Sequence, residues 1–219
     1  MSRRSYTYKT HALPDGYREL AWIATKMDAA FALSFGPRDA VLHAWLAWGK
    51  ETESYNTAMT ALGLWYSGRY EWHIMKYAAN HATYPNVLSY HYSPVSGDTC
   101  HDMAYQYGLF LQEIRGGASQ TTLKFDGTTT TLPTQNSNLP SSGTIAIGSG
   151  WDVGGNAFFA ARDYYQYLGY IALYTNTTLK YELIPALRRS DGKAGMYDLV
   201  NNVFHPSDTA VDFVAGPPV

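Results

Sequence analysis

The stretch that decides the fold is IPALRRSDGKAGMYDLVNNVF, residues Ile184 to Phe204. Two turn signals, DG at 191–192 and NN at 201–202, separate short apolar segments. Gly and Asn tolerate left-handed backbone, so both pairs predict tight turns between strands. Pro185 cannot donate to a sheet, which predicts that the first strand ends there or lies at an edge. We interpret the stretch as consecutive antiparallel strands that build a wall of the fold.

The same pattern extends outward along the chain. Short runs rich in Tyr, Trp, Val, Ile and Thr recur from Tyr17–Thr25 to Val211–Val214, separated by Gly, Pro, Asn, Asp and Ser. Such spacing is typical of strands in a sandwich or jelly roll. LKFDGTTTTL, Leu123–Leu132, predicts a hairpin around Asp-Gly. Short helices are considered only in Asp98–Tyr107 and Gly155–Arg162, and the expected class is all-β, with two antiparallel sheets.

Composition excludes several function classes. The chain has 219 residues, 16% of them charged, and a formal net charge of −2. This balance gives no electrostatic reason to expect nucleic acid or a membrane surface as a partner. No apolar run reaches the roughly 20 residues of a membrane span. Cys100 is the one cysteine, so an internal disulfide is impossible.

Three motifs resemble a known family. They are LPDGYRELAWIAT at Leu13–Thr25, ELIPALRRSDGKAGMYDLVNNVFH at Glu182–His205, and FVAGPPV at Phe213–Val219. GLWYSG at Gly63–Gly68 and FDGTTTT at Phe125–Thr131 extend the likeness through the middle. Together they resemble the concanavalin A-like, LamG-like jelly-roll domains of phage structural proteins and bacterial surface proteins. The family implies a fold, and it carries no agreed catalytic set.

The resemblance implies a single jelly-roll domain at 13–219, preceded by an N-terminal arm at 1–12 for assembly or docking. We expect a non-enzymatic phage virion structural protein: a capsid decoration, fibre or tail component that binds other virion proteins or copies of itself. Because no signal peptide is visible, we expect assembly in the host cytoplasm. The alternative is a bacterial surface carbohydrate-binding module.

A glycoside hydrolase is the remote alternative. Hydrolysis needs two carboxylates, about 5–5.5 Å or 6.5–9.5 Å apart, on either side of the scissile bond. The clusters used by glucanases of this fold, ExDxxE or ExDxE, are absent, and Glu113, Asp152 and Asp163 stand alone. We therefore expect no enzyme activity.

Metal ligands and cofactors are not indicated. A loop-rich region, Tyr77–Tyr105, holds the residues that could suit zinc: His81, His91, Cys100, His101 and Asp102. Structural zinc sites prefer tighter pairing than this spacing gives. A structural Ca²⁺ on Asp98, Asp102 or Asp152 is compatible with the fold, although nothing selects these residues. The expectation is no metal and no cofactor.

A glycan-binding face is predicted between residues 150 and 165. A sugar ring presents an apolar face and a fringe of hydroxyls, which an aromatic platform with fixed polar partners can recognise. The predicted set is Trp151, Tyr164 and Tyr165, with Asp163, Arg162 and Asn156 as polar partners. Its expected ligand is host cell-surface polysaccharide, bound weakly per copy and strengthened by many copies. The competing interpretation places these aromatic residues in the core.

Overall fold

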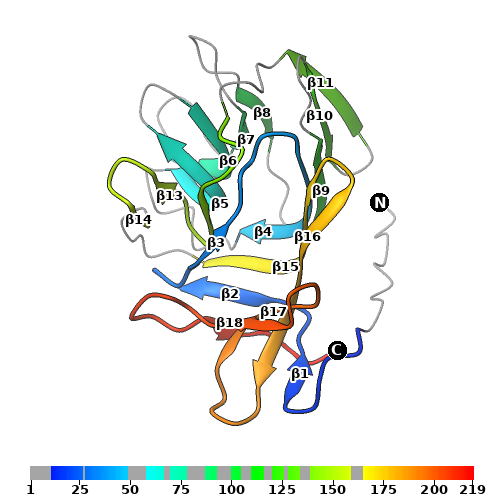
Figure 1. Ribbon diagram of the computed structural model, residues 1–219, viewed down its shortest axis with the longest axis vertical. Coiled ribbons are helices and arrows are strands. Elements are labelled where there is room, and N and C mark those ends of the chain that lie inside the picture. The colour runs from blue at the N-terminus through cyan, green and yellow to red at the C-terminus, as the bar shows by residue number, and fades with distance from the viewer. Residues whose placement is uncertain are drawn as a thin grey trace.

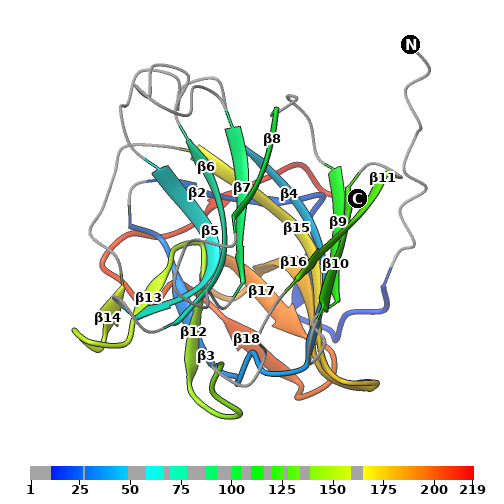
Figure 2. The same cartoon turned by 90° about the horizontal axis from the view of Figure 1, so that it is seen from above.

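The computed structural model describes residues 11–26, 28–48, 58–66, 70–77, 87–92, 100–104, 110–115, 120–125, 128–133, 139–158 and 165–219. Every regular element in this part of the chain is a strand. The strands form two sheets that face each other, seen most directly in Figure 2 with β5–β7 on one side and β4, β15 and β16 on the other. The prediction of an all-β jelly-roll sandwich is confirmed.

The larger sheet has eleven strands. Its main order is β11-β10-β9-β4-β15-β16-β17-β18, with β1 beside β16, and β2 between β15 and β19. The bounds are β1 Tyr17–Glu19, β2 Ile23–Lys26, β4 Ala40–Trp48, β9 Phe110–Arg115, β10 Gln120–Phe125, β11 Thr128–Pro133, β15 Tyr165–Thr175, β16 Thr178–Arg188, β17 Ala194–Asp198, β18 Val203–His205 and β19 Val214–Ala215. Figure 1 shows β4, β15 and β2 running side by side across the molecule.

The smaller sheet has eight strands, in the order β14-β13-β5-β6-β7-β8, with β12 between β3 and β5. The bounds are β3 Phe31–Ser34, β5 Ala58–Tyr66, β6 Tyr70–Tyr77, β7 Val87–Tyr92, β8 Cys100–Ala104, β12 Thr144–Ile147, β13 Trp151–Asp152 and β14 Ala157–Phe158. All its pairs are antiparallel except β13 with β5, which run parallel over two residues.

The core lies between the sheets and follows the two-residue period of the strands. On β4 it takes Leu42, Leu46 and Trp48, and on β6 it takes Trp72 and Ile74, all at most 2% exposed. Burying one such side chain is worth roughly 1.5–3 kcal/mol. This interdigitated layer needs no disulfide and holds both sheets as one body.

The strand pairing decides two alternatives that the sequence left open. The segment considered as a helix, Asp98–Tyr107, contains strand β8, because residues 100–104 pair with β7. Strand β16 does not end at Pro185 but continues to Arg188. Along one edge of β16, the pairing with β15 ends at Leu183, and the pairing with β1 begins at Ala186. Pro185 therefore sits in the gap between two neighbours, where its missing N–H costs little.

Both predicted hairpins are confirmed by strand pairing. Phe125 pairs with Thr128 across the Asp-Gly turn, whose own residues lie outside the described part. Asp198 pairs with Val203 across the second turn, with residues 199–202 as its loop. The second loop is longer than the Asn-Asn pair alone, because the strand ends at Asp198.

Candidate functional site

The β17–β18 loop is shaped by one buried carboxylate. Asp198 has no exposed surface. Its Oδ1 accepts hydrogen bonds from the backbone N–H groups of Val200 (2.9 Å) and Glu182 (3.2 Å). Its Oδ2 accepts from Asn201 Nδ2 at 2.5 Å. The carboxylate thus binds the loop to the neighbouring strand β16 and fixes Asn201 at the end of the sandwich.

Two loops from the smaller sheet meet this end of the molecule. A Cβ on Gly36 would lie 2.1 Å from the backbone carbon of Ser141, so only glycine permits this approach. Phe35 N–H donates to the Gly143 carbonyl at 2.9 Å, and Arg38 Nε donates to the Leu139 carbonyl at 2.7 Å. The loop after β3 and the loop before β12 therefore hold each other in place.

These segments enclose a pocket of about 300 Å³, which we call the Tyr181 pocket. It is lined by Ser34, Phe35, Gly36, Ser141, Ser142, Gly143, Thr175, Lys180, Tyr181 and Asn201. The lining comes from both sheets, with β3 and the loop before β12 from the smaller sheet and the β15–β16 hairpin and the β17–β18 loop from the larger one. The volume is at the lower limit of typical small-molecule sites, which suits a ligand of about one sugar ring.

Tyr181 is the aromatic wall of the pocket. Its ring is half-buried and meets Phe35 edge-on at 6.4 Å. Its hydroxyl donates to the Ser34 carbonyl at 2.8 Å, which leaves the phenolic oxygen as an acceptor. Burial, and secondarily the charge of Asp198, raises the pKa of Tyr181. The phenol therefore stays neutral at physiological pH.

The other polar groups have complementary roles. Asn201 Nδ2 donates to the Lys180 carbonyl (3.0 Å) as well as to Asp198. With both amide hydrogens committed, its side-chain oxygen is the free acceptor of that group. Lys180 makes no ion pair with any residue that the structure describes. The pocket thus combines an aromatic ring, an amide acceptor, an ammonium donor and several hydroxyls.

No carboxylate is among the described residues that line the pocket. Glu113 and Glu182, on the larger sheet, are separated by three strand intervals: Glu113 pairs with His43, His43 with Ala172, and Ala172 with Glu182. Three intervals place these backbones roughly 14 Å apart, farther than glycoside hydrolysis requires. Glu113 and Glu182 therefore do not form the carboxylate pair that glycoside hydrolysis requires.

The predicted glycan face is only partly described. Residues 162–164, which include Arg162, Asp163 and Tyr164, lie outside the described residues. Trp151 starts the β13–β14 hairpin of the smaller sheet, Asn156 is exposed in its loop at φ 49°, and Tyr165 starts β15 of the larger sheet. Whether they form one face stays a prediction.

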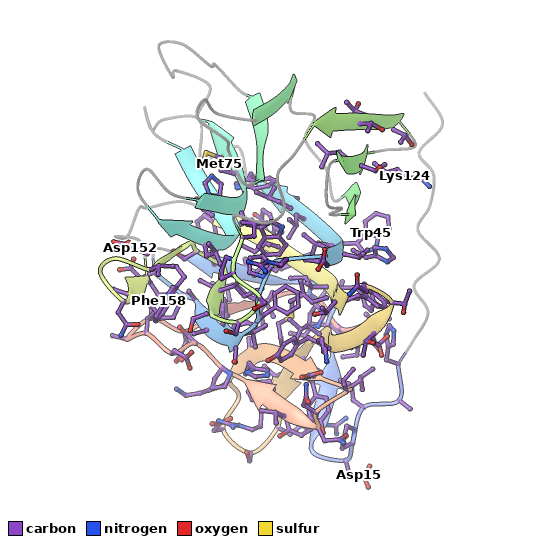
Figure 3. All side chains as sticks on the ribbon, turned by 45° about the horizontal axis from the view of Figure 1, so that its top comes forward. Asp15, Trp45, Met75, Lys124, Asp152 and Phe158 are labelled. Atoms are coloured by element: carbon purple, nitrogen blue, oxygen red, sulfur yellow. The ribbon has the colours of Figure 1, made fainter. Side chains whose placement is uncertain are left out.

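Trp151 itself has structural contacts. Its indole is half-buried, packs against the core, and meets the Phe158 ring edge-on at 5.2 Å. Asp152 Oδ1 accepts from Gly154 N–H at 2.9 Å. Figure 3 labels Asp152 and Phe158 together at the margin of the molecule. These contacts give Trp151 a packing role, which the sequence had weighed as the competing interpretation.

Candidate metal ligands are distributed unevenly. His81 and Asp98 lie outside the described residues, and His91, Cys100, His101 and Asp102 lie on β7 and β8. Among the described side chains, no group of three or more His, Cys, Asp or Glu could hold a metal. The described residues also include no helix long and apolar enough to cross a membrane.

The pocket residues were missed by sequence reasoning. PSSG at 140–143 belongs to a stretch that is visibly loop-forming, but nothing in it indicates that it meets Gly36 and Tyr181. Asn201 was interpreted only as a turn residue. The structural signature of this site is a polar loop packed against Gly36, where a side chain would clash. That contact is visible only once the fold is known.

No protein-family model matches the chain, and no curated protein matches it. Among solved structures, a single mutant of Congerin II is 12% identical, covering 70% of this chain and 99% of that chain, with a TM-score of 0.38. A glycosyl hydrolase family protein from Mycobacterium fortuitum is 14% identical over 69% of this chain and 74% of that one, with a TM-score of 0.40. A glycosyl hydrolase family 16 protein from Mycobacterium smegmatis has the same identity and coverage, with a TM-score of 0.38. The likeness to LamG-like phage domains stays a resemblance.

Proposed function

We propose that this chain is a non-enzymatic carbohydrate-binding protein that holds one sugar residue of a host-surface glycan in the Tyr181 pocket. The observation that carries the proposal is the composition of that pocket: a half-buried tyrosine beside a fixed amide and several serine and threonine hydroxyls, with no carboxylate among its described lining residues. An aromatic wall suits the apolar face of a sugar, and convergent polar groups suit its hydroxyls.

The pocket is also preorganised. The hydroxyl of Tyr181, the amide of Asn201 and the loop at Gly36 are held by the contacts described above. Groups that are fixed before binding lose little conformational freedom when the ligand arrives, which increases affinity. A single sugar ring still offers few contacts, so useful binding requires many copies of the protein.

A repeated particle supplies those copies, and the setting we propose is therefore a phage virion, as decoration, fibre or tail component. The support is the resemblance of the two terminal motifs. The end of the N-terminal arm contacts the larger sheet: His11 N–H donates to Glu19 Oε2 at 2.8 Å, and the His11 ring stacks on Tyr170 at 5.9 Å. This contact fixes the end of the arm on the larger sheet, and the proposed role of residues 1–10 is to dock to other virion proteins or other copies.

The binding proposal is tested by filling the pocket. Ser142 is exposed and lines the pocket, so Ser142→Trp places an indole in the space of the ligand. Ser190→Trp, at an exposed serine in the β16–β17 turn outside the pocket lining, is the matched control. We expect a glycan array and host cell-wall polysaccharide to bind the wild type and Ser190→Trp but not Ser142→Trp, with similar melting temperatures. Undiminished binding by Ser142→Trp would overturn the assignment of the pocket.

The virion setting is tested separately. Deletion of residues 2–10 leaves His11 and its contacts in place. We expect the wild type to co-purify with phage particles and the deletion variant to fold normally but to be lost from them. Normal incorporation of the deletion variant would show that the arm is not the anchor, whereas absence of the wild type from particles would reject the virion role.

A further inference from the structure

One residue of the Tyr181 pocket lies in a β-bulge. Leu173 of β15 pairs with Tyr181 of β16, but the next residue, Tyr174, pairs with Leu179. Lys180 is therefore the extra residue of β16, with no counterpart of its own on β15. A bulge bends its strand and re-aims a side chain, and bulges are common beside functional sites. The irregularity in β16 thus falls within the wall of the pocket.

The bulge explains how two consecutive residues line the same pocket. In a regular strand, successive side chains point to opposite faces of the sheet. Tyr181 packs against the core cluster, so a regular strand would direct Lys180 to the outer face. Both residues nevertheless line the pocket. The bulge therefore places a cationic residue beside the aromatic wall.

The β17–β18 loop holds the bulge in place. Asn201 Nδ2 donates to the backbone carbonyl of Lys180 at 3.0 Å, and the same amide group donates to the buried carboxylate of Asp198. Farther along β16, Glu182 N–H donates to Asp198, and the Glu182 carbonyl accepts from Leu199 N–H at 2.8 Å. The backbone at Lys180 is thus positioned before a ligand arrives, which reduces the entropy cost of binding there.

Lys180 carries the only charge among the described side chains that line the pocket. It is exposed and makes no ion pair with any described residue. Asp198 is the carboxylate behind Asn201, but it has no exposed surface and accepts three hydrogen bonds. A ligand can therefore contact a cationic group, and no anionic one, among the described residues of the lining.

We propose that the saccharide held in the Tyr181 pocket is acidic, and that Lys180 selects its anionic substituent. The inference rests on the proposed carbohydrate-binding function and adds a substrate class to it. An ammonium group binds carboxylate and phosphate oxygens alike, because it acts as a point charge and not as a planar fork. The substituent is therefore a carboxylate or a phosphate, as in a uronic acid residue or a sugar phosphate.

The other fixed polar groups of the pocket suit the neutral part of such a sugar. The hydroxyl of Tyr181 is committed as a donor to Ser34, and both amide hydrogens of Asn201 are committed as well. Both side chains are left with acceptor oxygens, which favour sugar hydroxyls and disfavour an anion. The anionic substituent is therefore expected at Lys180, with the hydroxyls of the ring towards Tyr181 and Asn201.

The inference is tested on the full-length chain with matched pairs of sugars: glucose with glucuronate, galactose with galacturonate, and glucose with glucose 6-phosphate. NMR titrations at low salt give the affinity ratio within each pair. We expect at least one acidic sugar to bind about fivefold more tightly than its neutral partner, the upper range for an exposed ion pair. The preference should shrink at high salt. The uronate and phosphate pairs distinguish the two sources of the anionic group.

Three variants test whether the preference belongs to Lys180. Lys180→Gln should reduce the affinity ratio to about one, whereas Lys180→Arg, which keeps the charge, should preserve a preference for the acidic sugar. Arg189→Gln removes an equal charge at an exposed residue outside the pocket lining, and it should leave the ratio unchanged. Melting temperatures check that each variant folds.

The outcomes separate this inference from the function on which it rests. Equal binding of neutral and acidic sugars by the wild type, lost in Ser142→Trp, would keep the carbohydrate site and overturn the acidic class. An acidic preference that survives in Lys180→Gln or in Ser142→Trp would overturn the assignment to Lys180 in this pocket. If no saccharide bound, neutral or acidic, the proposed function and this inference would be rejected together.

Discussion

Two hairpins of this molecule have nearly the same local design. WDVGGNAF spans Trp151–Phe158, and YDLVNNVF spans Tyr197–Phe204. In each, an aromatic residue pairs with a phenylalanine, the following aspartate pairs with a small or β-branched residue, and four residues form the loop. Each aspartate accepts a hydrogen bond from the N–H two residues on, at 2.9 Å. Each loop ends in an asparagine with positive φ, at 49° and 55°.

Their surroundings differ. Strand β17 pairs with β16 over five residues, and Asp198 reaches across to Glu182 N–H. Strand β13 pairs with β5 over only two residues, and Asp152 is half-buried. One hairpin therefore borders a preorganised pocket, and the other lies at a thinly paired margin. Local residue chemistry determines the turn, whereas the neighbouring strand determines whether its aspartate supports a site.

The largest expected effect comes from the two aspartates. Asp198→Ala removes a fully buried carboxylate that accepts from Glu182, Val200 and Asn201, and we expect a loss of about 3 kcal/mol or more in the free energy of unfolding. Asp152→Ala removes one bond at a solvent-accessible site and should cost about 1 kcal/mol or less. Urea titrations of both variants measure the difference. Equal losses would show that the two hairpins differ less than their burial indicates.

The second effect concerns Trp151, where packing and sugar binding predict different outcomes. Trp151→Ala removes a half-buried indole from the core margin and from Phe158, and we expect a loss of about 2 kcal/mol with the pocket's glycan binding retained. The predicted glycan face requires the reverse, with binding lost and stability nearly unchanged. Thermal melts and polysaccharide pull-downs on the same preparation distinguish the two. The Ser190→Trp protein serves as the folded reference.

Strands could be predicted from the sequence where their own residues favour β-structure. Val41–Trp48 and Thr144–Ile147 are apolar and β-rich, and both form strands with nearly those bounds. Strand β8 could not be predicted, because CHDMA contains no β-former and becomes a strand only beside β7. Pro185 favoured an early end to β16 in the sequence. The strand tolerates this proline because its pairing with β15 ends before Pro185 and its pairing with β1 begins after it.

The pocket was harder to predict than the fold. Its walls come from segments around residues 35, 142, 180 and 201, and their convergence depends on strand order rather than on any local motif. Local chemistry is readable from one sequence, but tertiary juxtaposition is not.

A smaller effect is expected at the loop asparagines. Asn202→Ala and Asn156→Ala each force alanine into a left-handed conformation that asparagine tolerates better, and each should cost about 1 kcal/mol. Because this backbone strain is local, we expect Asn202→Ala and Asn156→Ala to lose similar amounts of unfolding free energy. The two aspartate variants are expected to differ. The corresponding glycine substitutions should be nearly neutral. A several-fold larger loss at Asn202 in urea titrations would show that this position also depends on the neighbouring strand.

The smallest effect is electrostatic and lies in the β16–β17 turn, where a third aspartate uses charge instead of burial. Asp191 accepts from Arg188 Nε at 3.1 Å and from its Nη2 at 2.7 Å, and also from Lys193 N–H at 3.2 Å. The Arg188 hydrogen bonds lower the pKa of Asp191 from 3.8 to about 2. A carboxyl whose folded-state pKa is depressed contributes stability above its unfolded pKa, and that contribution is lost as pH falls through the folded value.

Asp191→Asn should therefore melt slightly below the wild type at neutral pH, and the gap should close between about pH 4 and pH 2. Because this turn is exposed, salt should also narrow the gap at neutral pH. Melting temperatures across this pH range, at low and high salt, measure both trends. If the difference in melting temperature between the wild type and Asp191→Asn were unchanged at pH 2, Asp191 would act through turn geometry, as Asp152 does, and not through its charge. Asp152, Asp191 and Asp198 would then differ only in burial, and the prediction that Asp191 stabilises its turn through its charge would be rejected.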